Sequence, residues 1–156
     1  MNTQRFAETL TDRDGRTYDV VFSSESATFI SAFVTTRNHH IGRINCLIDP
    51  EHGVLEITDL IIFDPPIIVP PWWEKLFPFL RRNPPRFRQR GLGDAMLDAI
   101  ISYAEALELD TITGCITRDD LAQTPYLPDF YEKHGFAVEF APESANGNAA
   151  TLLRVV

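Results

Sequence analysis

The chain has 156 residues, of which 44% are hydrophobic, and this matches one ordinary globular domain with a substantial core. Its net charge of −8 argues against a general nucleic-acid-binding protein, because phosphate neutralisation requires a broad basic face. The opening is polar and prolines or charges interrupt every apolar stretch, so we expect no signal peptide, no membrane span and a cytoplasmic location.

The first part of the chain predicts a series of strands. Four segments rich in Val, Ile, Phe and Thr are separated by short breaks, and they are Thr17–Ser23, Ala27–Thr36, His39–Ile48 and Val54–Phe63. The break at residues 49–53 has Pro and Gly where a tight turn needs them. We therefore expect these strands to be antiparallel neighbours.

From Leu92 the hydrophobic period changes to that of an amphipathic helix. Apolar residues recur at positions 92, 95, 96, 99, 100, 103, 106 and 107. The strand-like segment Thr111–Ile116 follows, so a strand, a helix and a strand occur in succession. This order predicts a right-handed parallel crossover.

The last part predicts one further helix and two strands. The helix is expected to begin near Thr124, with Pro125 in its first turn, and to end at Gly135. The strands are expected at Phe136–Phe140 and Thr151–Val156. The whole order predicts one α/β domain over residues 1–156, an α+β sandwich with a mixed, mostly antiparallel sheet of six to seven strands.

The start of the first predicted helix has the features of a phosphate-binding site. Helix N-termini present amides and a partial positive charge, and glycines let an anion approach the backbone. Here the helix start reads Arg88-Gln89-Arg90-Gly91-Leu92-Gly93. The segment lacks the third glycine of a dinucleotide fingerprint and the Lys-Ser/Thr of a Walker loop. A plain tight turn is the alternative.

Two motifs in the right order resemble the GNAT superfamily of acyl-CoA-dependent N-acyltransferases. The first is Arg-x-x-Gly-x-Gly, entered from a strand like Glu56–Ile62. The second is Tyr-x-x-x-Gly-Phe, which occurs here within Phe130–Phe136. The resemblance covers about residues 54–140. It implies the GNAT fold and acetyl-CoA as co-substrate, with no metal.

The resemblance also implies roles for particular residues in binding CoA. The loop would hold the pyrophosphate, Ile61 and Ile62 would pair through their backbone with the pantetheine arm, and Thr124 would either offer it a hydroxyl or merely cap a helix. The loop residues concerned are Arg88, Gln89, Arg90, Gly91, Leu92 and Gly93.

Two residues are candidates for proton transfer. Tyr131 matches the general acid of the family, and the alternative is a tyrosine packed in the core. Glu56 stands where many members have a carboxylate that removes the amine proton, and the alternative is a strand-end salt bridge. The predicted reaction is direct transfer of an acetyl or short acyl group from CoA to a primary amine of a small molecule or peptide.

Two other functions stay open at this point. A GNAT-like module could bind acyl-CoA and regulate without turnover. In a third hypothesis, a basic cluster in residues 81–90 contacts nucleic acid. The rest of the chain is acidic, so we expect no nucleic-acid partner. The cluster contains five arginines, Arg81, Arg82, Arg86, Arg88 and Arg90.

An insertion at residues 65–86 separates the strand from the phosphate-binding loop. It is rich in proline and contains Trp72 and Trp73, and large apolar groups of this kind are rarely left in water. Because the N-terminal region is short for the helices that wall the acceptor site in the family, we expect the insertion to form a lid or wall there. A homodimer interface and a small satellite core are the alternatives.

The cysteines and histidines show no metal-binding spacing. Cys46 and Cys115 are expected to be two buried, reduced thiols. All four histidines, including His134, are interpreted as surface or turn residues. We therefore predict no metal site.

Overall fold

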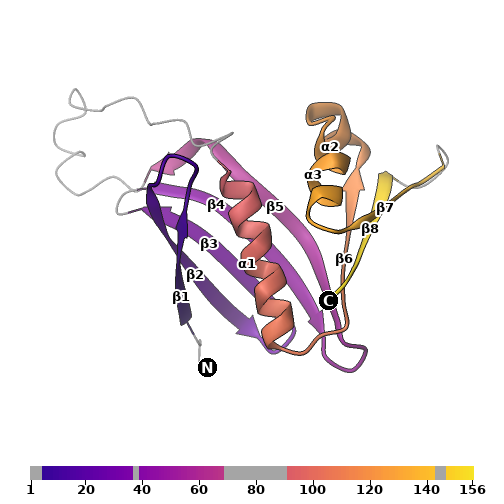
Figure 1. Cartoon of the computed structure of the whole chain (residues 1–156), viewed down its shortest axis with the longest axis horizontal. Coiled ribbons are helices and arrows are strands. Elements are labelled where there is room, and N and C mark those ends of the chain that lie inside the picture. Colours follow the sequence, from indigo (N-terminus) through magenta and orange to yellow (C-terminus); the bar gives the residue numbers. More distant parts are fainter. Residues whose placement is uncertain (1–4, 37–38, 69–90, 143–146) are drawn as a thin grey trace. The chain divides into compact units, whose positions relative to one another are not determined.

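The structure is a computed structural model, and it describes residues 5–36, 39–68, 91–142 and 147–156. Figure 1 shows the elements in chain order. They are β1 (Arg5–Thr11), β2 (Thr17–Ser26), β3 (Phe29–Thr36), β4 (His39–Asp49), β5 (Val54–Ile68), α1 (Leu92–Ala106), β6 (Thr111–Thr117), α2 (Arg118–Gln123), α3 (Leu127–Lys133), β7 (Ala137–Phe140) and β8 (Asn148–Val155).

The strands join in the order β1-β2-β3-β4-β5-β6-β8-β7. The pairs β1–β2, β6–β8 and β7–β8 are antiparallel, and β5–β6 is parallel, as the crossover through α1 requires. The predicted mixed, mostly antiparallel sheet is thus confirmed. Strand β1 is an eighth strand, which was not predicted because Arg5–Thr11 is largely polar.

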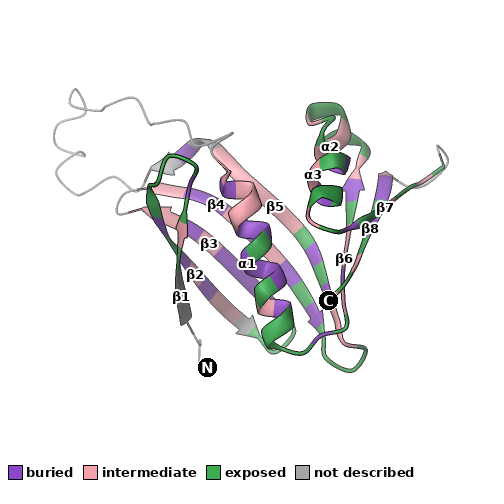
Figure 2. Ribbon diagram, in the orientation of Figure 1, coloured by how far each residue is buried: buried purple, intermediate pink, exposed green. Residues whose placement is uncertain are grey.

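The chain forms two compact units, which we describe separately. The first comprises Met1–Ser26, Ile30–Asn45 and Asp59–Met96, and the second comprises Ala27–Phe29, Cys46–Thr58 and Leu97–Val156. Burial alternates in β2 of the first unit and at the start of β5 in the second, and Figure 2 shows a buried stripe along α1. In the first unit the largest fully buried side chains are Val20, Val34, Ile41, Ile44, Leu92 and Met96, and in the second they are Cys46, Leu55, Leu97, Ile100, Ile112 and Ile116.

The turn between β1 and β2 is built around a buried carboxylate. Asp12 is only 5% exposed, and its Oδ1 accepts hydrogen bonds from the backbone amides of Asp14 and Arg16, both at 2.9 Å. Its Oδ2 accepts a hydrogen bond of 2.6 Å from the hydroxyl of Tyr18, which is itself buried. The tip of the hairpin is therefore fixed by three donors that bond to one carboxylate, that of Asp12.

Strand β5 is longer than the sequence indicates. It was expected to end at Phe63, but it runs to Ile68 and includes Pro65 and Pro66. Proline has no amide hydrogen, so it is tolerated in a strand only where one edge is not paired. The pairing of β5 with β6 ends at Ile57, well before these prolines.

The helix expected from near Thr124 to Gly135 is present as α3, but it starts later, at Leu127. A further short helix, α2, precedes it, and Thr124 ends that helix, with its amide bonded to the carbonyl of Asp120 at 2.7 Å. Helix α2 has its own capping box, formed by Thr117 and Asp120. Helix α3 starts after Tyr126, whose side chain makes no capping bond.

The prediction that both cysteines are buried is wrong for one of them. Cys46 is fully buried, but Cys115 is exposed. The reason is strand alternation, because Ile112 and Ile116 in β6 point into the core and Cys115 points the other way.

Within the described part of the chain, no helix is long and apolar enough to cross a membrane. In the same residues, no three His, Cys, Asp or Glu side chains gather in a way that could hold a metal ion.

Candidate active site

The N-terminus of α1 presents backbone amides beside a glycine turn. Gly91 has φ +79°, in the left-handed region that favours glycine, and its carbonyl accepts the first helical bond from Ala95 at 3.1 Å. The amides of Leu92 and Gly93 therefore precede the hydrogen-bonded ladder and point out of the helix end. Leu92 is 1% exposed and anchors this turn in the core. Such an end can hold an anion.

The other loop residues of the predicted phosphate site lie outside the described residues. This applies to Arg88, Gln89 and Arg90, and equally to Trp72 and Trp73 of the insertion. Their predicted roles stay predictions.

Strand β5 loses its parallel neighbour before it reaches Ile61 and Ile62, where the pantetheine arm was predicted to bind. The register with β6 runs from Val54↔Thr111 to Ile57↔Gly114, and β5 then continues to Ile68. An edge of this kind can add an extended ligand as if it were a strand.

The close approach of β4 decides which β5 residue faces this edge. A Cβ on Gly42 of β4 would stand 2.9 Å from the carbonyl oxygen of Ile61, so that carbonyl points toward β4. Backbone groups alternate between the two edges of a strand, so the amide and carbonyl of Ile62 point the other way. Of the two predicted residues, Ile62 is the better placed to pair with a ligand.

The segment Phe130–Phe136 closes α3 with a Schellman motif. The amide of Phe136 bonds to the carbonyl of Tyr131 at 3.2 Å, and the amide of Gly135 bonds to that of Glu132 at 2.9 Å. Gly135 has φ +81°, which explains the glycine. The rings of Tyr131 and Phe136 meet edge to face at 5.5 Å, which is the hydrophobic contact that accompanies this motif.

Tyr131 is 7% exposed, and its ring also meets that of Phe130 at 5.2 Å. This packing is compatible with both readings of Tyr131, a proton donor with a fixed ring and a tyrosine of the core.

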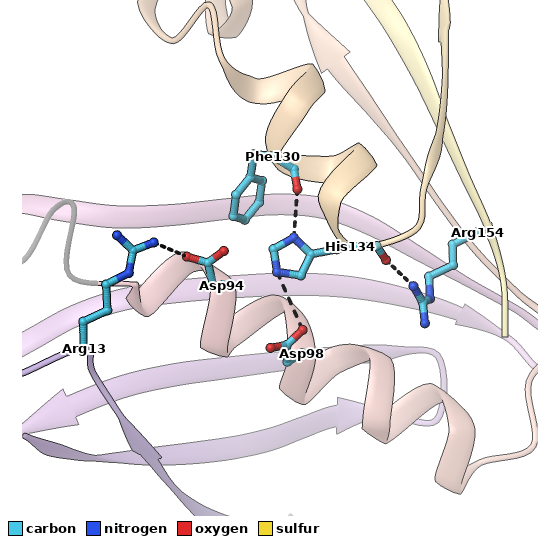
Figure 3. Close-up of polar contacts among 6 residues, drawn as sticks. All are labelled: Arg13, Asp94, Asp98, Phe130, His134 and Arg154. Atoms are coloured by element: carbon cyan, nitrogen blue, oxygen red, sulfur yellow. Dashed lines mark hydrogen bonds and ion pairs between the residues drawn. The ribbon is translucent and has the colours of Figure 1, made fainter. Parts of the chain in front are cut away.

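His134 lies in the turn that ends α3, in agreement with the expectation of a surface or turn residue, although its side chain is largely covered. Its side chain is 7% exposed, and its Nδ1 donates to the carbonyl of Phe130 at 2.8 Å (Figure 3). Its Nε2 lies 3.6 Å from Oδ1 of Asp98 on α1. The guanidinium of Arg154 donates to the backbone carbonyl of His134. A cation at the last carbonyls of α3 also suits the helix dipole.

Glu56 lies on the exposed side of β5, between the buried residues Leu55 and Ile57, and opposite Thr113 of β6. Within the described residues it forms no ion pair, so the alternative of a strand-end salt bridge has no support there. An exposed carboxylate is accessible to an amine or to water.

Comparison with solved structures shows the fold of GNAT acetyltransferases. The PaiA N-acetyltransferase of Thermoplasma acidophilum, solved with coenzyme A, matches with a TM-score of 0.54 and 14% identity over 83% of this chain and 62% of that chain. A GNAT-family acetyltransferase of Streptococcus pneumoniae matches with a TM-score of 0.55 and 16% identity over 85% of this chain and 70% of that chain. The ribosomal-protein-S18-alanine N-acetyltransferase of Escherichia coli matches with a TM-score of 0.55 and 12% identity over 85% of this chain and 72% of that chain.

The chain thus spans less than two thirds of the Thermoplasma acidophilum enzyme. No protein-family model matches the sequence, and neither does any curated protein.

Proposed function

We propose that the protein is an N-acetyltransferase of the GNAT superfamily, which moves an acetyl or short acyl group from CoA to a primary amine. One observation carries the proposal: β5 loses its pairing with β6 after Ile57, and the helix that follows β5 begins at a positive-φ glycine. A strand edge that β6 no longer pairs with, followed by an amide-bearing helix end, is what the pantetheine and pyrophosphate of CoA need.

The residues present fit this co-substrate. The amides of Leu92 and Gly93 would bind the pyrophosphate, and the backbone of Ile62 would pair with the pantetheine arm. Acetyl-CoA supplies the thioester, whose carbonyl carbon is attacked directly by the amine without a covalent enzyme intermediate. Holding both reactants together contributes much of the rate.

Two side chains would move the protons. The amine must lose a proton as the N–C bond forms, and Glu56, an exposed carboxylate, is the proposed acceptor, directly or through water. The thiolate leaves as the C–S bond breaks, and Tyr131 is the proposed donor. A phenol with a pKa near 10 can protonate a thiolate whose parent thiol has a pKa near 8.5.

The second candidate is a module that binds acyl-CoA without turnover. It is favoured only if the burial of Tyr131 reflects a purely structural role. The acceptor is proposed to be a small-molecule or peptide amine in the cytoplasm.

Binding is tested by thermal unfolding with and without CoA. A ligand at 100 times its dissociation constant stabilises the folded state by about 2.7 kcal/mol, so the wild type should shift clearly. Gly93→Val should abolish the shift while the variant still folds, because a side chain there would obstruct the amides. Equal shifts in both proteins would contradict the placement of the pyrophosphate.

Turnover is tested by following free thiol with acetyl-CoA and a panel of amines. Tyr131→Phe keeps the ring and removes the donor, so we expect the rate to fall about 10²- to 10⁴-fold with little change in CoA affinity. Tyr126→Phe is the matched control, because Tyr126 is 61% exposed. CoA binding without turnover of any amine would favour the non-catalytic module.

A further inference from the structure

The hairpin β1–β2 fixes the backbone on both sides of Arg13. Arg13 directly follows Asp12, whose carboxylate organises the turn. The backbone on both sides is bonded as well, with the amide of Asp12 to the carbonyl of Arg16 at 2.9 Å and the amide of Gly15 to the carbonyl of Asp12 at 3.0 Å. A loop organised in this way restricts where the Arg13 side chain can go.

The Arg13 side chain lies against the first turn of α1 (Figure 3). Its Nη2 donates to Oδ2 of Asp94 at 3.5 Å. Its Cγ and Nε would stand 3.1 and 3.2 Å from a Cβ on Gly91, which is closer than side chains normally pack. The positive φ of Gly91 favours glycine there, and the Arg13 side chain that lies on it would have to shift slightly to admit a Cβ.

The charges at this helix end explain why an arginine is useful there. Asp94 is half-buried in the first turn of α1, where a carboxylate stabilises the helix but repels a phosphate. Arg13 offsets that charge. Its side chain is 67% exposed, so the guanidinium also faces solvent and offers a fork of donors suited to phosphate oxygens.

We propose that Arg13 is a phosphate-binding residue of the CoA site, delivered from the β1–β2 hairpin to bind the pyrophosphate beside the amides of Leu92 and Gly93. This inference rests on the proposed function. The sequence motif contains only residues around the α1 start, whereas Arg13 is far away in the chain and is brought there by the fold.

The test compares dissociation constants for CoA, 3′-dephospho-CoA and pantetheine by calorimetry. Arg13→Ala should weaken CoA and 3′-dephospho-CoA by about tenfold, as expected for a charge-assisted hydrogen bond, and leave pantetheine unchanged. Arg16→Ala is the matched control, because it removes the same charge from the same hairpin at an exposed position. It should bind CoA within about twofold of the wild type, because Arg13, and not Arg16, makes the contact with the first turn of α1.

Asp94→Asn separates ligand binding from a mere ion pair. If Arg13 binds phosphate, this variant should bind CoA about two- to threefold more tightly, because a repelling charge is gone. If Arg13 only joins the hairpin to α1, both variants should lose stability alike and Arg13→Ala should keep the CoA affinity of the wild type, which overturns the proposal.

The remaining outcomes are equally decisive. A loss that disappears with 3′-dephospho-CoA would assign Arg13 to the 3′-phosphate and overturn the pyrophosphate assignment. If the wild type binds no CoA, the proposed function itself is contradicted. If the wild type and Arg13→Ala bind CoA with equal affinity, only the role of Arg13 is contradicted.

Discussion

The β1–β2 hairpin and the junction between α3 and β7 both reverse the chain sharply, but different interactions stabilise them. The hairpin depends on one buried carboxylate, Asp12, and on the donors that point at it. The junction depends on backbone bonds around Gly135 and on the edge-to-face contact of Tyr131 with Phe136.

The difference shows two ways of fixing a turn next to a functional segment. A turn built on a charge depends on pH but has little apolar surface to lose. The aromatic packing of the other turn does not depend on pH, but that turn is destabilised when a packed side chain is replaced by a smaller one. The following predictions test this contrast, and the largest expected effect comes first.

Truncation of the aromatic contact should have the largest effect on stability. Phe136 is 3% exposed, so Phe136→Ala leaves a cavity against Tyr131 and should lower the free energy of unfolding by about 3–5 kcal/mol. Urea unfolding followed by circular dichroism measures it. The matched control is Phe140→Ala in the same strand region, where Phe140 is 61% exposed, and a change within about 0.5 kcal/mol is expected. Equal losses would refute the aromatic contact as the main stabiliser.

Removal of the hydroxyl from the hairpin should have a smaller effect. Tyr18→Phe removes a buried donor to a carboxylate, and hydrogen bonds to charged groups are worth about 1.5–3 kcal/mol. The exposed Tyr126→Phe is the control. A loss of unfolding free energy no larger than that of the control would mean that the hydrogen bond from Tyr18 to Asp12 does not stabilise the hairpin.

The hairpin should also make stability depend on pH at both ends of the scale. The hydrogen bond from Tyr18 lowers the pKa of Asp12, so its stabilising effect is complete above the ordinary aspartate pKa of about 3.9 and is lost as pH falls through the folded value. Burial, and then the bond to Asp12, raise the pKa of Tyr18 to about 12, so stability is kept below about pH 10 and lost between there and about 12.

Unfolding measured across pH tests this dependence. The Tyr18→Phe variant should lose less stability in acid than the wild type and should lack the alkaline loss assigned to Tyr18. Parallel curves for the two proteins would contradict the linkage.

The smallest stability effect is expected at the exposed cysteine. Native protein should react with a thiol reagent at Cys115 only, because burial raises the pKa of the Cys46 thiol to about 12 and excludes the reagent. Cys115→Ser should abolish the native reaction and change stability by less than about 0.5 kcal/mol. Two thiols reacting at the same rate in the native protein would contradict the burial of Cys46.

Much of the fold follows from hydrophobic period in the sequence. The strands from Thr17 to Phe63 were predicted because those segments are rich in Val, Ile, Phe and Thr, and the helix from Leu92 was predicted from its 3.6-residue period. Strand β1 was missed because its partner β2, and not its own composition, makes it a strand. The break between α2 and α3 was missed because a capping box at Thr117 competes with the Thr124-Pro125 signal.

The candidate site was predicted only where it is local in sequence. The glycine turn at Gly91 and the Gly135-Phe136 ending carry recognisable motifs, since both need positive φ. Arg13 and Gly42 carry no motif, because their importance comes from residues that the fold brings beside them. The aspartate-and-arginine run around Asp12 was the only available signal for the hairpin, and it is equally typical of a solvated turn.

The short parallel ladder between β5 and β6 has a consequence for the order in which the chain folds. It joins Val54 with Thr111 across a long intervening segment, whereas the β1–β2 hairpin starts from the nearby pair Thr11 and Thr17. The entropy lost on closing a loop grows with its length, so the hairpin is expected to form early and the ladder late. The edge that we assign to CoA therefore becomes defined only when the slowest pairing of the sheet is complete.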